Sequence, residues 1–184
     1  YSDTFQRTDD LFFEYARILG DIQPKVFVAE NVYGLVVGEA KVIFQKISNE
    51  LKSKGYNVEC RLLNAKYFNV AENRSRLIWI GVRKDLNIEP SHPKPQTKPI
   101  AIQEVMKDLK NEEWDLKGAS YKTTSSTYQY LLKMKPGECG SDYNEKGSYF
   151  GLSRLVWDKP ANTVLQNDAK HISCSVIHPD EHRR

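Results

Sequence analysis

Hydrophobic and polar positions follow two different periods along the first 83 residues. Residues 9–22 carry apolar side chains at helical spacing, which predicts an amphipathic helix whose apolar face comprises Leu11, Phe12, Tyr15, Ile18, Leu19 and Ile22. Asp9 and Asp10 suit the start of this helix, and Gln23-Pro24 ends it. The continuously apolar run at residues 26–29 predicts a fully buried strand.

A second helix is predicted for residues 38–54, where Gly55 follows the last turn. Its apolar side comprises Val42, Ile43, Phe44, Ile47 and Leu51. Residues 56–65 and 76–83 have the composition and alternation of strands. The order helix, strand, helix, strand, strand favours an α/β fold with parallel strands. The last two strands are expected to be antiparallel neighbours, because their connection is too short for a helical crossover.

The periodicity is lost after Arg83. Residues 87–99 hold four prolines and have the character of a linker, and a short helix is expected at 102–109. Residues 111–150 are rich in Gly, Ser, Thr, Tyr and Lys and predict a small, loop-rich insert. Residues 154–167 form strand-like pieces broken at 158–160. We therefore divide the chain into a core at 1–86, an insert at 87–152 and a return segment at 153–184.

Composition narrows the class of protein. The 184 residues carry a net charge of +3, which is compatible with a nucleic-acid partner without being diagnostic. Three widely spaced cysteines, Cys60, Cys139 and Cys174, argue for a reducing compartment. With no apolar run near 18 residues, we expect a soluble, cytoplasmic protein and no membrane partner. Because the chain starts at Tyr1 and stops within a polar stretch, we expect it to be a fragment of a longer protein.

Glu30 and Asn31 follow the predicted buried strand directly. Ligands of open α/β sheets bind beyond the carboxyl ends of the strands. A partly desolvated carboxyl group there would favour its neutral form, which can donate a hydrogen bond or a proton. The alternative, a strand that simply ends in polar residues, is equally compatible with the sequence.

Two arginines form a second candidate site. Arg74 and Arg76 share one side of a predicted extended segment, because side chains alternate along a strand. Two guanidinium groups at this spacing can clamp a phosphate or a base carbonyl. Taken alone, the pair is more simply explained as a solvated strand entrance.

Other candidate features are weaker. Cys174, His178 and His182 have ligand-like spacing, but no second cysteine lies near and Pro179 makes the segment a turn, so no metal site is expected. No phosphate loop and no Gly-x-Gly-x-x-Gly motif occurs in the sequence. Four aromatic residues of the insert could stack on bases, but packing within the insert is the simpler role: Trp114, Tyr121, Tyr128 and Tyr130.

The stretches FVAENVYGL and YNVECRLLNAKYFNVAENRSRLIWIGVR together resemble the C5-cytosine DNA methyltransferases. Glu30-Asn31-Val32 matches the family's Glu-Asn-Val motif, and Arg74 and Arg76 match the arginines of its Gln-x-Arg-x-Arg motif. RLVWDKPANTV is similar to the segment after the family's target-recognition region, and HPDEHRR to the start of its next motif. The resemblance implies the carboxyl-terminal half of a Rossmann-like methyltransferase sheet with a target-recognition insert.

The resemblance also implies a reaction and a role for each motif residue. The family adds a cysteine thiolate to C6 of a flipped cytosine in double-stranded DNA, and C5 then takes a methyl group from S-adenosyl-L-methionine. Glu30 would relieve the charge at N3, and Asn31, with Val32, would support the neighbouring catalytic loop. Arg76 and Arg74 would hold the base carbonyl and a phosphate. A prokaryotic restriction-modification setting is expected.

Several positions depart from the family pattern. The nucleophilic Pro-Cys loop and the Gly-rich cofactor motif lie upstream in the family. This fragment alone is therefore expected to be inactive, and no cofactor-binding residue is identified in it. Cys60 lies inside a predicted strand and is expected to be inert. Tyr33 replaces the usual proline, Ala71 another proline, and Glu72 the usual glutamine, which puts the individual arginine roles in doubt.

Alternative functions stay open at this stage. The chain could be a non-catalytic DNA-binding module derived from the family, or part of an RNA cytosine-5 methyltransferase. A separate insert of about 65 residues favours duplex DNA. Half a sheet leaves an edge and an apolar face open, so the fragment is also expected to self-associate.

Overall fold

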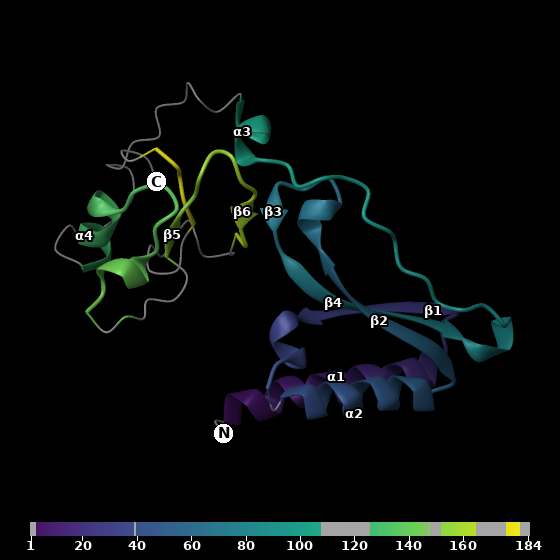
Figure 1. Ribbon diagram of the computed structural model, residues 1–184. Coiled ribbons are helices and arrows are strands. Elements are labelled where there is room, and N and C mark those ends of the chain that lie inside the picture. The colour runs from purple at the N-terminus through teal and green to yellow at the C-terminus, as the bar shows by residue number, and fades with distance from the viewer. Residues whose placement is uncertain are drawn as a thin grey trace. The chain divides into compact units, whose positions relative to one another are not determined.

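The computed structural model describes residues 3–38, 40–107, 126–145, 147, 152–164 and 176–180 (Figure 1). The chain forms two compact units. Unit 1 comprises residues 1–63 and 75–94, and unit 2 comprises residues 64–74 and 95–184. The predicted boundaries at 86/87 and 152/153 were drawn from changes in amino-acid composition and periodicity, whereas the two units are defined by contacts in the structure. Those boundaries stay a prediction.

Unit 1 contains a three-stranded sheet in the order β1-β4-β2, formed by β1 (Val26–Val32), β4 (Ser75–Arg83) and β2 (Tyr56–Asn64). β1 pairs with β4 in antiparallel register. The backbone N–H of Lys84 donates to the carbonyl of Gly55, so β2 is antiparallel to β4 as well. The predicted α/β fold and the antiparallel neighbours are confirmed. β1 and β2 run parallel to each other, but β4 lies between them.

Two helices, α1 (Asp3–Ile22) and α2 (Ala40–Ser53), lie side by side on one face of this sheet (Figure 1). The buried core between these layers comprises Ala16, Leu19, Phe27, Ala29, Leu35, Ile47, Leu51, Tyr56, Leu77 and Trp79. α1 begins at Asp3, so the predicted start at Asp9 is wrong. Part of its predicted apolar face, Leu11, Ile18 and Ile22, is exposed, because the helix buries only the narrower stripe that meets the sheet and α2.

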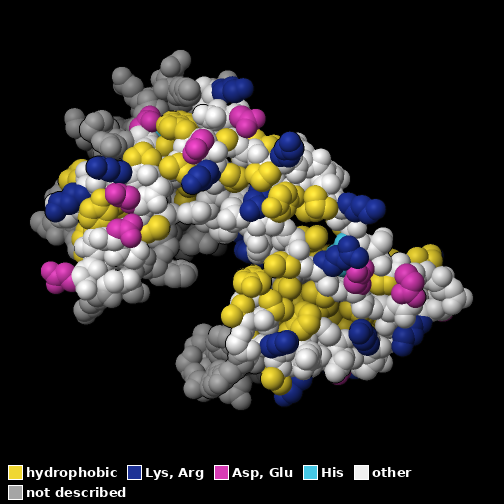
Figure 2. All heavy atoms as spheres, viewed as in Figure 1, with side chains coloured by type: hydrophobic (Ala, Val, Ile, Leu, Met, Phe, Trp, Pro, Cys, Tyr) yellow, Lys and Arg dark blue, Asp and Glu magenta, His cyan; other side chains and the backbone are white. Residues whose placement is uncertain are grey.

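β1 is not the fully buried strand that its apolar run predicts. Phe27 and Ala29 are buried, whereas Val26 and Val28 are 52% and 61% exposed. Within unit 1 the helices pack on the face that carries Phe27 and Ala29, so alternate residues of β1 point away from the core. Figure 2 shows hydrophobic side chains gathered on unit 1 over the region of β1 and the turn that follows it. The strand also continues through Val32, so it does not end at residue 29.

A close contact fixes one position of the central strand. Phe27 and Gly81 are cross-strand partners. A Cβ atom on Gly81 would lie 2.0 Å from the Phe27 ring. Glycine therefore leaves the room in which this ring packs edge-on against the rings of Tyr15 and Tyr56.

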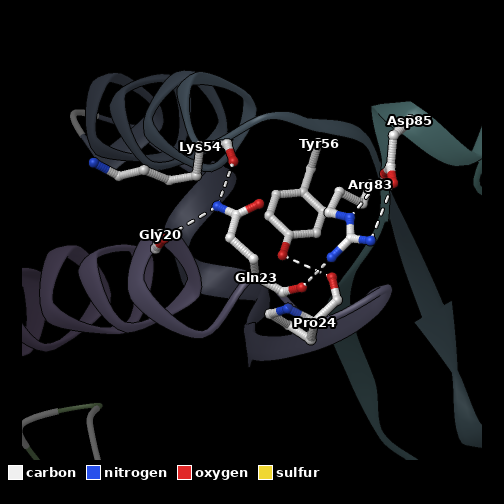
Figure 3. A network of polar contacts seen from close by, with 7 residues as sticks. All are labelled: Gly20, Gln23, Pro24, Lys54, Tyr56, Arg83 and Asp85. Carbon is white, nitrogen blue, oxygen red and sulfur yellow. Dashed lines mark hydrogen bonds and ion pairs between the residues drawn. The ribbon is translucent and has the colours of Figure 1, made fainter.

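A polar network joins the carboxyl ends of both helices to the sheet (Figure 3). Gln23 follows α1 in the left-handed backbone region, with φ 50°. Its amide Nε2 donates to the carbonyls of Gly20, at 3.1 Å, and Lys54, at 3.2 Å. These carbonyls belong to helix ends that lack partners within the helix. One side chain therefore links α1 to the end of α2.

The same corner also holds β1, β2 and β4 together (Figure 3). The hydroxyl of Tyr56 donates to the carbonyl of Pro24 at 2.8 Å. The guanidinium of Arg83 donates to the carbonyl of Gln23 at 2.5 Å and pairs through two nitrogens with Asp85. This corner precedes β1, so it lies at the opposite end of that strand from Glu30.

Unit 2 is built from short elements: β3 (Glu72–Asn73), α3 (Ile102–Val105), α4 (Ser126–Lys133), β5 (Ser153–Arg154), β6 (Ala161–Asn162) and β7 (Val176–Ile177). β3 pairs with β6 and β5 with β7, both in parallel. β5 and β6 flank residues 158–160, which confirms the predicted break. α3 starts as predicted but ends at Val105, and residues 108–109 of the predicted helix lie outside the described residues.

A small hydrophobic core of unit 2 comprises Leu131, Met134, Leu152 and Ile177. Tyr128 and Tyr130 pack against it, in line with a packing role, whereas Trp114 and Tyr121 lie outside the described residues. Arg154 is buried and donates to the carbonyls of His178, Asp180 and Leu131. This guanidinium therefore fastens the segment at 176–180 to α4 and β5.

Candidate active site

Glu30 and Arg76 form an ion pair between two neighbouring strands of unit 1. The register places Val32 opposite Arg76, so Glu30 lies diagonally across from it on the same face of the sheet. The Nε atom of Arg76 lies 2.7 Å from Oε1 of Glu30. A second guanidinium nitrogen, Nη1, donates to the carbonyl of Ser75 at 2.8 Å. The arginine is therefore held from two sides and presents its charge to the carboxylate.

The environment of Glu30 differs from the desolvated pocket that the sequence suggested. Its side chain is 48% exposed, whereas that of Arg76 is 20% exposed. Glu30 is therefore open to solvent on one side and paired with the guanidinium on the other. The pair sets a hydrogen-bond acceptor and several donors side by side at the end of β1. Such an array is complementary to the polar edge of a planar heterocycle.

Asn31 and Val32 complete the strand after Glu30. The Oδ1 atom of Asn31 accepts a hydrogen bond from the backbone N–H of Val32 at 2.7 Å. The strand then passes directly into a 3₁₀ turn, Tyr33–Val36, whose Leu35 enters the core. Asn31 thus fixes the local backbone at the strand end, and its predicted support of a neighbouring loop stays a prediction.

Arg74 lies in unit 2, whereas Arg76 lies in unit 1. Its Nη1 atom is 4.0 Å from Oε1 of Glu72, at the limit of an ion pair. The predicted common clamp of Arg74 and Arg76 stays a prediction. What the structure describes is that each arginine has its own carboxylate partner, Glu30 for Arg76 and Glu72 for Arg74.

The cysteines of the described segments offer no activated thiol in unit 1. Burial raises the pKa of the Cys60 thiol to about 12. The thiol is therefore protonated at neutral pH and is a poor nucleophile, in agreement with the expectation that it is inert. Cys139 is partly buried in unit 2, and Cys174 lies outside the described residues.

Histidine and carboxylate side chains do not assemble into a metal centre within the segments that the structure describes. The Nδ1 atom of His178 accepts a hydrogen bond from the backbone N–H of Asp180 at 3.1 Å. Its ring packs edge-on against Trp157. Cys174 and His182 lie outside the described residues. Nor is any helix in the described part of the chain long and apolar enough to cross a bilayer.

The sequence profile of the C-5 cytosine-specific DNA methylases matches residues 2–173. The chain belongs to this family. Among curated methylases, the Type II methyltransferase M.FnuDI of Fusobacterium nucleatum is 39% identical over 161 residues, and M.NgoPII of Neisseria gonorrhoeae is 40% identical over 159 residues. Each match covers 84% of this chain and 44% of the relative, so this methylase chain spans less than half the length of either.

The fold of the methylase chain also resembles a solved structure. A crystal structure of a proposed DNA modification methyltransferase encoded within a prophage (E. coli) aligns with a TM-score of 0.59 and 20% sequence identity. The alignment covers 95% of this chain and 60% of that one. At this identity the likeness supports the fold alone, and it agrees with the α/β class of unit 1.

Two features of the methylase chain were not predicted from its sequence. Glu30 and Arg76 were singled out separately, but their contact depends on the β1–β4 register, which no local pattern gives. Arg154 was not singled out, although a lone arginine between apolar residues, in LSRLVW, is the available signal. A buried guanidinium needs hydrogen-bond partners, and the carbonyls of His178, Asp180 and Leu131 supply them. These partners cannot be predicted from the local sequence.

Proposed function

We propose that this chain is part of a DNA (cytosine-5-)-methyltransferase and forms the wall of the active site that holds the target cytosine. The observation that carries this proposal is the Glu30–Arg76 ion pair at the end of β1. It stands in a chain that belongs to the C-5 cytosine-specific DNA methylases. Both residues also lie in the two stretches that match the family's motifs.

The pair fits the chemistry that cytosine requires. When a thiolate adds to C6, negative charge builds at N3 and O2 of the ring. Arg76 donates to O2. Glu30 in its protonated form donates to N3, and its other carboxyl oxygen accepts from the exocyclic amine. The proton of Glu30 moves toward N3 as negative charge develops there, and the enamine that the addition forms is nucleophilic at C5. Cytosine therefore replaces part of the bond between Glu30 and Arg76 when it binds.

The thiolate itself comes from another segment of the whole protein in this proposal. Cys60 is excluded by its raised thiol pKa, and it lies on β2, two strands away from β1. The base must also leave the duplex stack to reach Glu30, as in other enzymes that act on a base. We therefore propose double-stranded DNA as the partner, with unit 2 as the target-recognition part.

S-adenosyl-L-methionine is the proposed cofactor, and it would supply an electrophilic methyl group for C5. The described residues do not fit a site for it. The turn after β1, Tyr33–Val36, carries a single glycine, and no strand-to-helix turn among the described residues has the glycine-rich form that cradles a nucleotide. A prokaryotic restriction-modification setting stays a prediction.

The decisive experiment traps the enzyme on its substrate. The protein at its native length is incubated with S-adenosylmethionine and duplex DNA that carries 5-fluorocytosine, and intact mass detects a covalent adduct. Fluorine at C5 blocks the final elimination. We expect an adduct with the native protein and a rate of formation reduced by about 10²–10⁴-fold in Glu30→Ala, the range for a lost general acid.

A matched control keeps the fold while leaving the ion pair intact. Glu50→Ala removes a carboxylate that pairs on the surface of α2, and it is expected to form adduct at the native rate. An adduct that forms equally fast in Glu30→Ala contradicts the role of Glu30. DNA binding without any adduct, over several sequences, would support a DNA-binding module without chemistry, and methyl transfer onto RNA alone would overturn the choice of substrate.

A further inference from the structure

Glu72 holds an anionic charge in a fixed position beside Arg74. Its Oε1 atom accepts a hydrogen bond from the backbone N–H of Val164 at 3.1 Å. The same oxygen lies 4.0 Å from Nη1 of Arg74. The two side chains are 22% and 36% exposed, respectively, so both remain within reach of solvent.

The surrounding backbone explains why this carboxylate cannot swing away. Glu72 lies on β3, which pairs in parallel with β6 through Ala161 and Asn162. The backbone N–H of Ala161 donates to the carbonyl of Ala71 at 2.8 Å. With its backbone held by β6 and its side chain held by Val164, Glu72 stays where its charge acts on Arg74.

The distance of 4.0 Å has a specific consequence for Arg74. It exceeds that of a charge-assisted hydrogen bond, so the guanidinium keeps donors available for another anion. The nearby negative charge nevertheless repels that anion and offsets part of the attraction from Arg74. Partial exposure keeps this effect moderate, because water screens charges at the surface.

We propose that Glu72 weakens the hold of Arg74 on a DNA phosphate and so lowers the sequence-independent part of the affinity for DNA. The inference rests on the proposed function, in which unit 2 binds duplex DNA. Phosphate contacts supply sequence-independent affinity, whereas base contacts supply discrimination. A carboxylate beside a phosphate-binding arginine lowers the sequence-independent contribution, so removal of its charge should raise the affinity for any DNA duplex.

The test measures the salt dependence of binding to duplex DNA without a target site, using the protein at its native length. Glu72→Gln is the informative variant, because the amide oxygen still accepts from Val164 while the charge is removed. We expect about two- to fivefold tighter binding near 0.1 M salt, the size of an exposed charge interaction. The slope of log K against log salt should become steeper by up to about 0.9, the value for one further phosphate contact.

Two controls separate this effect from a general loss of negative charge. Asp158→Asn removes the same charge from an exposed position of unit 2, and its salt slope should stay at the native value. Glu72→Gln combined with Arg74→Ala should bind no more tightly than Arg74→Ala alone. Should Glu72→Gln fold poorly, Glu72→Leu also removes the charge, and its slope should become steeper in the same way.

Each outcome of the salt-dependence measurement either supports or overturns the role of Glu72. A steeper slope in Glu72→Gln that disappears without Arg74 supports the proposal. An unchanged slope, an equal change in Asp158→Asn, or a gain that persists in the Arg74→Ala background overturns it. If the native protein binds DNA and forms the fluorocytosine adduct while the slope is unchanged, only the role of Glu72 fails. If the native protein binds no DNA, the proposed function fails, and the inference fails with it.

Discussion

Two ionisable side chains of unit 1, Glu30 and Cys60, lie in different environments. Glu30 remains half exposed, and Arg76 balances its charge at 2.7 Å. Cys60 is partly buried, and desolvation raises the pKa of its thiol to about 12. At the scale of single residues, the sheet therefore leaves the carboxyl group of Glu30 accessible near the end of β1 and keeps the Cys60 thiol on β2 protonated.

The raised pKa of Cys60 predicts slow alkylation. With a pKa of about 12, the thiolate fraction at pH 8 is on the order of 10⁻⁴ in the folded chain. We expect iodoacetamide to modify Cys60 at least about 100-fold more slowly in buffer than in urea. Peptide mass spectrometry after timed labelling measures both rates. Equal rates in the two conditions would show that the thiol is not protected by the fold.

The same shift gives the sign of a pH dependence. The folded chain holds the Cys60 proton more tightly than the unfolded chain, whose thiol titrates near its ordinary pKa of 9.0. The stabilisation is therefore complete below pH 9 and is lost as the pH rises from 9 toward 12. Cys60→Ala should flatten the decrease of the unfolding free energy between pH 9 and 10, as followed by urea denaturation.

At the scale of elements, the carboxyl ends of α1 and α2 are joined by one glutamine. Gln23 donates to carbonyls of both helices, and the carbonyl of Gln23 accepts from Arg83 at the end of β4. Helix ends leave four carbonyls without partners in the helix, so a side chain that serves two helices replaces water at both. The corner fixes how the helical layer meets the sheet.

Removing this link should destabilise unit 1. We expect Gln23→Ala to lower the free energy of unfolding by about 1–3 kcal/mol, since two hydrogen bonds of about 0.5–1.5 kcal/mol each are lost. Glutamine and alanine are both strained by the positive φ at position 23, so this strain cancels in the difference in unfolding free energy. Gln45→Ala, at an exposed position of α2, is the matched control and should change stability by less than about 0.5 kcal/mol. Equal effects in urea denaturation would contradict the role of Gln23.

The helices and strands were largely predictable, because the hydrophobic periodicity of each one is a property of a short stretch of sequence. β2 begins at the predicted residue and α2 lies within its predicted range, and the left-handed Gly55 follows α2 as expected. The pairing of the strands was harder to predict from the sequence. The position of β4 between β1 and β2 depends on contacts far apart in sequence, and the exposure of Val28 depends on which face the helices cover. The partner of Arg76 depends on the same register.

At the scale of the whole molecule, unit 1 has a helical layer on one face of its sheet. The other face of β1 carries Val26, Val28 and Val32, all more than half exposed, and the neighbouring Val28–Ile80 pair is apolar as well. Exposed hydrophobic areas of this kind are typical of surfaces that bind other protein. This face of β1 is therefore the surface through which we expect the chain to self-associate, as its sequence predicts.

A charge in the centre of that surface should test the prediction. We expect the chain of 184 residues to sediment as oligomers, and Val28→Lys to shift it toward the monomer, because the charge would be buried in the contact. Val42→Lys is the control, since Val42 is 57% exposed but lies on α2. A native chain that sediments as a single monomeric species would contradict the prediction.

The order β1-β4-β2 has a consequence for synthesis on the ribosome. β4 is the last of the three strands to be translated, yet both other strands make their backbone hydrogen bonds with it. β1 and β2 therefore emerge some fifty and twenty residues ahead of their common partner and wait unpaired, while α1 and α2 can already form. Chains paused before residue 83 should be helical but sensitive to protease, and protection should appear in one step once β4 has left the tunnel.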